Sequence, residues 1–315
     1  IKENLKSYSK NIGDSYSITV QADFKEGSAY FFMDSRGSEF PGFLEFRLEK
    51  NGKYKANLAM ALSPEKKLAF SLPFATFGGI WTKDGLSSEI LERFVYQVLD
   101  ELKSMGVETL EIIQPPKPYV AQSDLIHNVL WKSGFELRKI LSHQFFLGKK
   151  KIKRFVMEQS PRMHRKEKDS GIRVKLGPIS NFKFLDEIKT WNSARGYSVS
   201  FEEKRLISQV SDFPDKYFLI SISQGENTIA QSLVVKLTPD SLYYFLSASD
   251  PKSKVKNLGD SLIFYLFQLA LEQKAEVIDL GSSESNQEIN HSLMYFKSRF
   301  SNDISNKVFW VKKIV

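Results

Sequence analysis

The sequence predicts two consecutive domains of mixed α/β structure. A chain of 315 residues is long enough for about two domains of ~150 residues, each able to bury a core of its own. Both halves show the same order of expected elements: a hairpin, a strand, a glycine-containing turn, a long helix, a strand, a short helix and a final strand. Short motifs occupy equivalent places in the two halves. We therefore expect one unit used twice, through a duplication.

In the first half, apolar residues alternate over 43–62 on both sides of Asn51-Gly52, a dipeptide typical of hairpin turns. A helix with a 3.6-residue apolar period follows; Ser87 or Ser88 can cap it, and Gly106 ends it. The other expected elements are strands at 67–74 and 107–114, a short helix at 124–132, and a strand or strand pair at 135–148. Before residue 40, strand character is seen at 16–21 and 29–33, without a motif.

The second half repeats this order after a basic connector. Its expected elements are helices at 181–192 and 201–210, a hairpin at 217–237, a strand at 241–249, a turn at 254–261 with its long helix, a strand at 277–283, a helix at 291–300 and a strand at 307–315. The turn 82–87 corresponds to 256–261, and the segment 130–135 to 295–300. We place the first domain at 1–150, a basic connector helix at 151–170 and the second domain at 171–315.

Composition limits the partners. A net charge of +8 and a pI near 9.3 favour anionic partners such as nucleotides, coenzyme A, tRNA or lipid headgroups. The absence of cysteine excludes disulfides, thiolate metal sites and thiol nucleophiles. The four histidines, His127, His143, His164 and His291, are too scattered to propose a metal site. No apolar run reaches the ~18 residues of a membrane span, and no signal-peptide core is seen, so we expect a cytoplasmic protein.

The connector around 148–171 fits two interpretations. It is either a solvated linker with a short amphipathic helix, or a patch that binds tRNA or phosphate. The segment lacks the interleaved aromatic residues of a surface on which bases stack.

Particular residues resemble the GNAT acyltransferase fold. Lys256-x-x-Gly259-x-Ser261 is a degenerate form of the Gln/Arg-x-x-Gly-x-Gly/Ala turn of that family, and residues 294–300 are similar to its Phe-Tyr-x-Lys-x-Gly-Phe helix, with the glycine lost. Two such units, with PFATFGG at 73–79, resemble the FemAB-like family, which includes the Fem-type aminoacyltransferases. The segments 160–177 and 247–254 are also similar to that family, and the resemblance covers about 40–315.

The resemblance implies an N-acyltransferase. The group would pass from acyl-CoA as co-substrate, or from aminoacyl-tRNA, to an amine acceptor in the cleft between the domains. Such an acceptor is a small molecule or resembles a peptidoglycan precursor, and no metal is implied.

The turn before the second long helix is the candidate donor site. A helix N-terminus presents unpaired N–H groups and a positive dipole to a phosphate, and Gly259 lets the backbone approach it closely. The candidate donor-binding residues are Lys254, Lys256, Asn257, Gly259 and Ser261. The alternative is an ordinary helix start capped by Asp260 or Ser261.

Candidate chemistry lies in the second domain. The resemblance implies that Tyr295 is the general acid that protonates the leaving group, with a core tyrosine as the alternative. Glu284 is the candidate base, whereas Asp279 is expected to be buried against backbone amides. Lys297 contacts either an anionic group or solvent. Ser282 and Ser283 are candidates to bond the acceptor, with no histidine placed to activate either.

The first domain is expected to be a scaffold and the acceptor-side wall. Its turn carries Thr82 and Asp84 around the position of the glycine, and Leu130 stands where Tyr295 stands in the second domain. A second hypothesis remains for the whole chain: a catalytically inactive tandem GNAT scaffold that binds an anionic ligand or a protein partner.

Overall fold

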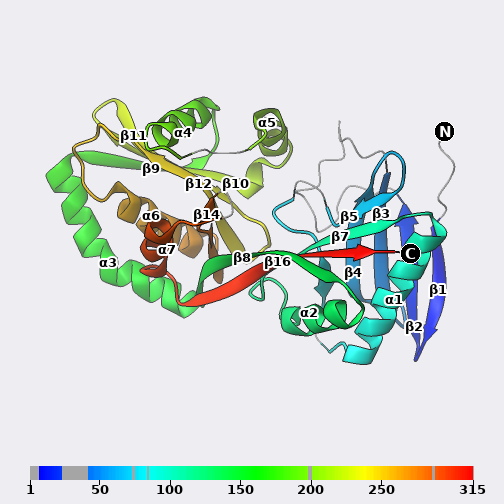
Figure 1. Cartoon of the computed structure of the whole chain (residues 1–315). Coiled ribbons are helices and arrows are strands. Elements are labelled where there is room, and N and C mark those ends of the chain that lie inside the picture. Colours follow the sequence, from blue (N-terminus) through cyan, green and yellow to red (C-terminus); the bar gives the residue numbers. More distant parts are fainter. Residues whose placement is uncertain are drawn as a thin grey trace. The chain divides into compact units, whose positions relative to one another are not determined.

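The chain folds into two compact units, formed by residues 1–142 with 305–315 and by residues 143–304. The structure, a computed structural model, describes residues 7–22, 42–72, 75–83, 85–197, 201–285 and 288–314. Each unit is a mixed sheet with helices, which is the expected fold class (Figure 1). The chain enters the second unit within β8 (Glu136–Leu147) and returns within β16 (Asp303–Lys313).

This division differs from the boundaries that the sequence suggested, because the last strand belongs mainly to the first unit. β16 pairs antiparallel with β7, from Val308 opposite Gln114 to Lys313 opposite Thr109 (Figure 1). Val308 and Trp310 lie in the first core.

The first unit orders its strands as β1-β2-β3-β4-β5-β7-β16, with β6 paired to β4. Its remaining elements are β1 (Tyr8–Gly13), β2 (Tyr16–Ala22), β3 (Gly42–Lys50), β4 (Lys53–Leu62), β5 (Leu68–Phe70), β6 (Ile80–Thr82), α1 (Ser88–Ser104), β7 (Thr109–Gln114) and α2 (Ser123–Lys132). The expected hairpin is confirmed: its turn residues Asn51 and Gly52 have φ of 49° and 71°. The strand expected at 16–21 is confirmed as β2, and the stretch 29–33 lies outside the described residues.

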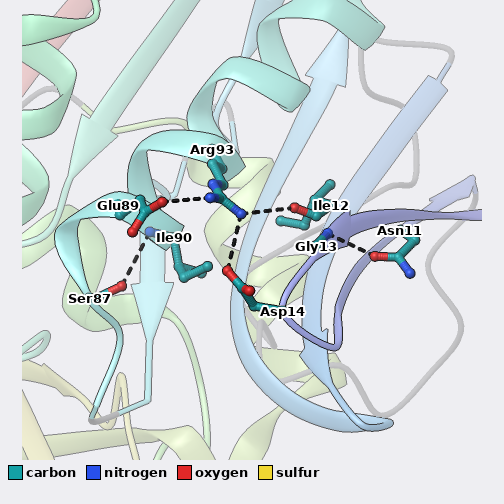
Figure 2. A network of polar contacts seen from close by, with 8 residues as sticks. All are labelled: Asn11, Ile12, Gly13, Asp14, Ser87, Glu89, Ile90 and Arg93. Carbon is teal, nitrogen blue, oxygen red and sulfur yellow. Dashed lines mark hydrogen bonds and ion pairs between the residues drawn. The ribbon is translucent and has the colours of Figure 1, made fainter.

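Arg93 of α1 ties the β1–β2 turn to this helix. Its guanidinium donates to the carbonyl of Ile12 at 3.3 Å and pairs with Asp14 at 3.2 Å and Glu89 at 2.5 Å (Figure 2). β2 also pairs with β3 along its whole length. The N-terminal hairpin is therefore part of the first sheet.

The N-terminus of α1 distinguishes the two serines that the sequence offered as caps. The Ser87 hydroxyl accepts the N–H of Ile90 at 3.3 Å, whereas Ser88 is already the first helical residue (Figure 2). We expect Ser87→Ala to lower the free energy of unfolding of the first unit by about 1 kcal/mol, because one N–H loses its partner. Ser88→Ala is the control, and urea unfolding followed by circular dichroism measures both. Equal effects of the two changes would contradict this assignment.

The second unit orders its strands as β8-β13-β12-β11-β10-β9. Its helices are α3 (Lys149–Ser170), α4 (Lys183–Ser193), α5 (Glu203–Asp212), α6 (Leu258–Glu272) and α7 (His291–Ser298), with a 3₁₀ turn at Pro214–Lys216. Its further strands are β9 (Ile172–Pro178), β10 (Tyr217–Gln224), β11 (Asn227–Val235), β12 (Ser241–Ser249), β13 (Val277–Ser282), and the short β14 (Glu284–Ser285) and β15 (Glu288–Ile289). β9 was not expected as a strand.

The connector helix is confirmed as α3, but its 22 residues make it longer than the short helix of the linker interpretation, and it is not a solvated linker. Its apolar side chains Ile152, Val156 and Met163 are buried in the second core. Phe155 packs against Phe267 of α6, with 4.1 Å between the ring centroids. Its basic side chains are exposed, except that of Lys166, which is partly buried. None of the helices in the described ranges combines the length and the apolar character needed to cross a membrane.

Candidate functional site

Two neighbouring parallel strands of the second unit separate partway along their length. β12 and β13 pair at three positions only, ending with Tyr243 opposite Asp279. β12 continues beside β11 as far as Ser249. β13 is irregular between Asp279 and Ser282 in its pairing with β8, and Gly281 there has a φ of 73°. The sheet therefore opens beyond Tyr243.

A pocket of about 490 Å³ lies at this opening. Its walls come from β12, the end of β13, the first turn of α6, α7 and the segment after α4. The lining residues are Asn192, Arg195, Tyr197, residues 244–249, Gly259, Leu262, Ser282, Glu284, Asn290, Ser292, Leu293, Phe296 and Lys297. All of them belong to the second unit.

Lys297 supplies a buried positive charge at the wall of this pocket. Its side chain is 7% exposed, and its Nζ donates to the carbonyl oxygen of Ser282 at 2.6 Å. Burial lowers the pKa of the Lys297 ammonium to about 8, and the carboxylate of Asp279 opposes this shift. Lys297 therefore does not lie on the solvent face, which was one of the two interpretations of the sequence. With a pKa of about 8, the Lys297 side chain can gain or lose a proton near neutral pH.

Asp279 is fully buried, as expected. Its Oδ1 accepts the backbone N–H of Gly281 at 2.7 Å. Nδ1 of His143, which is 2% exposed, lies 3.1 Å from both carboxylate oxygens. Sequence reasoning dismissed His143 as one of four scattered histidines, because only the pairing of β8 with β13 brings it to Asp279.

The turn before α6 is held from outside by the connector helix. Nζ of Lys166 donates to the carbonyl of Asn257 and to the hydroxyl of Ser261, both at 2.8 Å. Ser261 is fully buried, so its hydroxyl is already engaged with the protein. Lys254 and Lys256 are exposed.

The alternative capping scheme for α6 is wrong. The N-cap is Asn257, with a φ of 55°, and Asp260 instead pairs with Arg299 at 2.9 Å. Gly259 has a packing role, because a Cβ there would lie 3.2 Å from the ring of Phe296. The candidate donor residues are thus adjacent in the structure, but only Gly259 among them lines the pocket.

The other candidates are divided between the pocket and its surroundings. Ser282 and Glu284 line it. Ser283 is 1% exposed and is not a lining residue. Tyr295 points away from the pocket, and its side chain is 71% exposed. Among the described residues of α7, several line the pocket, but Tyr295 does not. Its role as general acid remains a prediction from the resemblance.

Arg195 is a pocket residue that the sequence did not indicate. It follows α4, and its guanidinium donates to the hydroxyl of Ser249 at 2.9 Å. The loop carries no motif, so nothing in the sequence distinguishes this arginine from other surface cations. Among the described lining residues, Arg195 and Lys297 are the cations and Glu284 is the carboxylate.

In the first unit, Leu130 is fully buried in the core, unlike the exposed Tyr295 at the corresponding position. Asp84 lies outside the described residues, as do residues 73 and 74 of the PFATFGG stretch.

Comparison with known proteins shows which solved structures share this fold. Neither a scan against protein families nor a search of curated proteins finds a match. Among solved structures, FemX shares the fold with a TM-score of 0.62 at 10% identity, over 85% of this chain and 87% of that one. The C-terminal domain of a candidate lysylphosphatidylglycerol synthetase from Agrobacterium fabrum has a TM-score of 0.51 at 11% identity, covering 82% of this chain and 81% of that one.

The structure of L-PGS from Bacillus licheniformis also has a TM-score of 0.51, at 14% identity, with 82% of this chain and 81% of that one covered. At these identities the likeness concerns the fold. The chain thus shares the fold of FemX, and the expected resemblance to FemAB-like proteins is confirmed at the level of the fold.

Proposed function

We propose that the chain is an N-acyltransferase that moves an acyl or aminoacyl group from a phosphate-bearing donor to an amine acceptor. One observation supports this most strongly. The buried ammonium of Lys297 lines a pocket that opens where β12 and β13 separate, beside the first turn of α6.

The chemistry needs a group that stabilises the oxyanion, an acid for the leaving group and a base for the amine proton. The pocket supplies a candidate for each role. The acceptor nitrogen attacks the donor carbonyl carbon, an N–C bond forms, and the C–S or C–O bond of the donor breaks. A cation in a site shielded from water stabilises the oxygen that becomes negative on the way, and Lys297 is placed for this. With a pKa of about 8, Lys297 can also give a proton to the departing sulfur or oxygen. Glu284 can accept the amine proton, directly or through water.

For an acyl-CoA donor, we propose that the phosphates bind at the turn before α6. Its first N–H groups and the exposed Lys254 and Lys256 provide the positive potential. Lysine acts here as a point charge without the two-pronged geometry of arginine. Asp260 would oppose an anion, but its charge is offset by Arg299.

For an aminoacyl-tRNA donor, the basic face of α3 is the proposed contact. This face exposes eight cations, Lys149, Lys150, Lys151, Lys153, Arg154, Arg162, Arg165 and Lys168. The apolar face of α3 is buried, so the exposed part offers charge and no stacking surface. The acceptor class implied by the FemAB-like resemblance is an amine of a peptidoglycan precursor or a similar small molecule. Both donors are cytoplasmic, and we propose the same location for the chain.

One observation favours a second candidate function, a non-catalytic scaffold that binds an anionic ligand or a protein partner. Tyr295, the proton donor implied by the resemblance, is exposed and outside the pocket. The transfer assay below separates the two functions, because a scaffold would transfer nothing from any donor.

We expect charge reversal to identify the donor. Lys256→Glu should raise KM for an acyl-CoA about tenfold or more with little change in kcat, because a phosphate contact is lost in ground and transition states alike. Arg162→Glu with Arg165→Glu should instead affect only aminoacyl-tRNA. The assay follows acylated amines by mass spectrometry with acetyl-CoA, longer acyl-CoAs and bulk aminoacyl-tRNA. Lys175→Glu, an exposed reversal on β9, is the matched control; an equal effect there would contradict both contacts.

A further inference from the structure

The charge of Lys297 lies inside the second unit, where an ammonium is costly unless a carboxylate faces it. Asp279 is the carboxylate beside it: its Oδ1 accepts the N–H of Gly281 at 2.7 Å, and a Cβ on Gly281 would lie 3.7 Å from Nζ of Lys297. The charge of Asp279 also opposes the lowering of the Lys297 pKa by burial. Nζ of Lys297 donates its hydrogen bond to the carbonyl of Ser282 at 2.6 Å. Two parts of the second unit hold this fully buried carboxylate in its orientation.

The irregular backbone of β13 holds one side of Asp279. At Gly281 the left-handed conformation turns the N–H toward Oδ1, at 2.7 Å. A Cβ on Gly281 would lie 3.3 Å from the ring of Tyr243 and 3.7 Å from Nζ of Lys297. The same irregularity places the carbonyl of Ser282 against Lys297. The bulge therefore brings the carboxylate, the carbonyl and the ammonium together.

His143 holds the other side. Its Nδ1 lies 3.1 Å from each oxygen of Asp279, and since a carboxylate only accepts, Nδ1 donates. The ring stacks with that of Tyr243, with centroids 6.3 Å apart and planes at 16°. It is 2% exposed, so its orientation is fixed by packing.

We propose that His143 and Asp279 are positioning residues for Lys297: Asp279 is the counter-ion of the buried ammonium, and His143 keeps the carboxylate in place. The pair maintains the charge of Lys297 at the pocket wall. Among the described residues, the other titratable side chains that line the pocket are Arg195, Tyr197, Tyr244 and Glu284, and Tyr243 of β12 lies beside Gly281. The statement that catalysis uses this charge belongs to the proposed function, and the inference rests on the proposed function in that respect.

The test is an NMR titration of Lys297 in the full chain with ¹³C-labelled lysine, its signal assigned by loss in Lys297→Arg. In the chain without a substitution, we expect the titration midpoint of Lys297 to lie near pH 8. Asp279→Asn should lower it by about one pH unit or more, because the counter-charge is removed. His143→Phe should lower the midpoint as well, since the carboxylate loses the donor that holds it in place beside Lys297. His143→Gln keeps an N–H donor and should stay close to the unchanged chain.

An unchanged midpoint in folded Asp279→Asn and His143→Phe would overturn the inference, as would equal shifts in His143→Phe and His143→Gln. If Asp279→Asn does not fold, the two His143 variants decide the matter. The titration needs no substrate, so the outcomes separate. Shifts as expected in a chain that transfers nothing would leave the positioning pair standing and contradict the proposed function. Transfer with no shifts would contradict the pair alone.

Discussion

Replacing Lys297 by methionine is expected to lower the rate of acyl transfer by a factor of about 10² to 10³, the usual cost of removing one group that stabilises a developing oxyanion. Methionine keeps an unbranched side chain of similar length, so the helix and the pocket should persist. Because the lost interaction forms mainly in the transition state, kcat should fall and donor binding should change little. Steady-state kinetics with the identified donor measure both quantities.

Lys297→Arg and Lys175→Met are the controls for this prediction. The arginine keeps a positive charge that does not titrate near pH 8, so part of the activity should remain and the alkaline loss of activity should disappear. With lysine, activity should fall as the pH rises through about 8, because the ammonium form is lost. Lys175 is exposed on β9, so Lys175→Met should leave the rate of acyl transfer unchanged. Full activity of Lys297→Met would remove this residue from the mechanism.

Phe267→Ala is expected to lower the free energy of unfolding of the second unit by about 3–5 kcal/mol. Phe267 is fully buried on α6, and its ring centroid lies 4.1 Å from that of Phe155 on α3 and 4.7 Å from that of Phe146 on β8. Truncation would leave a cavity between three elements. Urea unfolding followed by tryptophan fluorescence and circular dichroism measures the loss.

Leu271→Ala is the control on the same helix. Leu271 is 36% exposed, so its truncation should cost much less than that of Phe267. The comparison tests whether α3 is a structural part of the second unit. If α3 were a solvated linker, Phe267→Ala would leave a surface that rearranges easily, and its cost would be close to that of Leu271→Ala.

Local signals predicted most of the fold. The Asn51-Gly52 dipeptide predicted one hairpin, and the apolar period after Ser87 predicted the first long helix. The connector was predicted as a helix, but its many cations concealed that Ile152, Val156 and Met163 share a face that packs against the core. β16 was predicted as a strand, but its place beside β7 depends on a pairing between distant segments.

The site was less predictable for the same reason. Motif resemblance directed attention to α7, and Lys297 does line the pocket there. The resemblance could not show that Tyr295 faces solvent, since that depends on how α7 is rotated against the sheet. His143 reaches Asp279 from 136 residues away in the sequence, and Arg195 reaches Ser249 from a loop without a motif. Such contacts depend on strand register and loop geometry.

The central claim, that the pocket beside Lys297 binds the donor, is tested most directly by thermal-shift measurements with acetyl-CoA, longer acyl-CoAs, free CoA and bulk aminoacyl-tRNA. Ligand binding to the folded chain raises Tm by mass action. Ser292 is exposed on α7 and lines the pocket, so Ser292→Trp should fill it; Ser298→Trp, exposed on the same helix outside the pocket, is the control. We predict a rise in Tm with at least one donor class that Ser292→Trp abolishes and Ser298→Trp preserves. No shift with any donor, or a shift that survives Ser292→Trp, would contradict the claim.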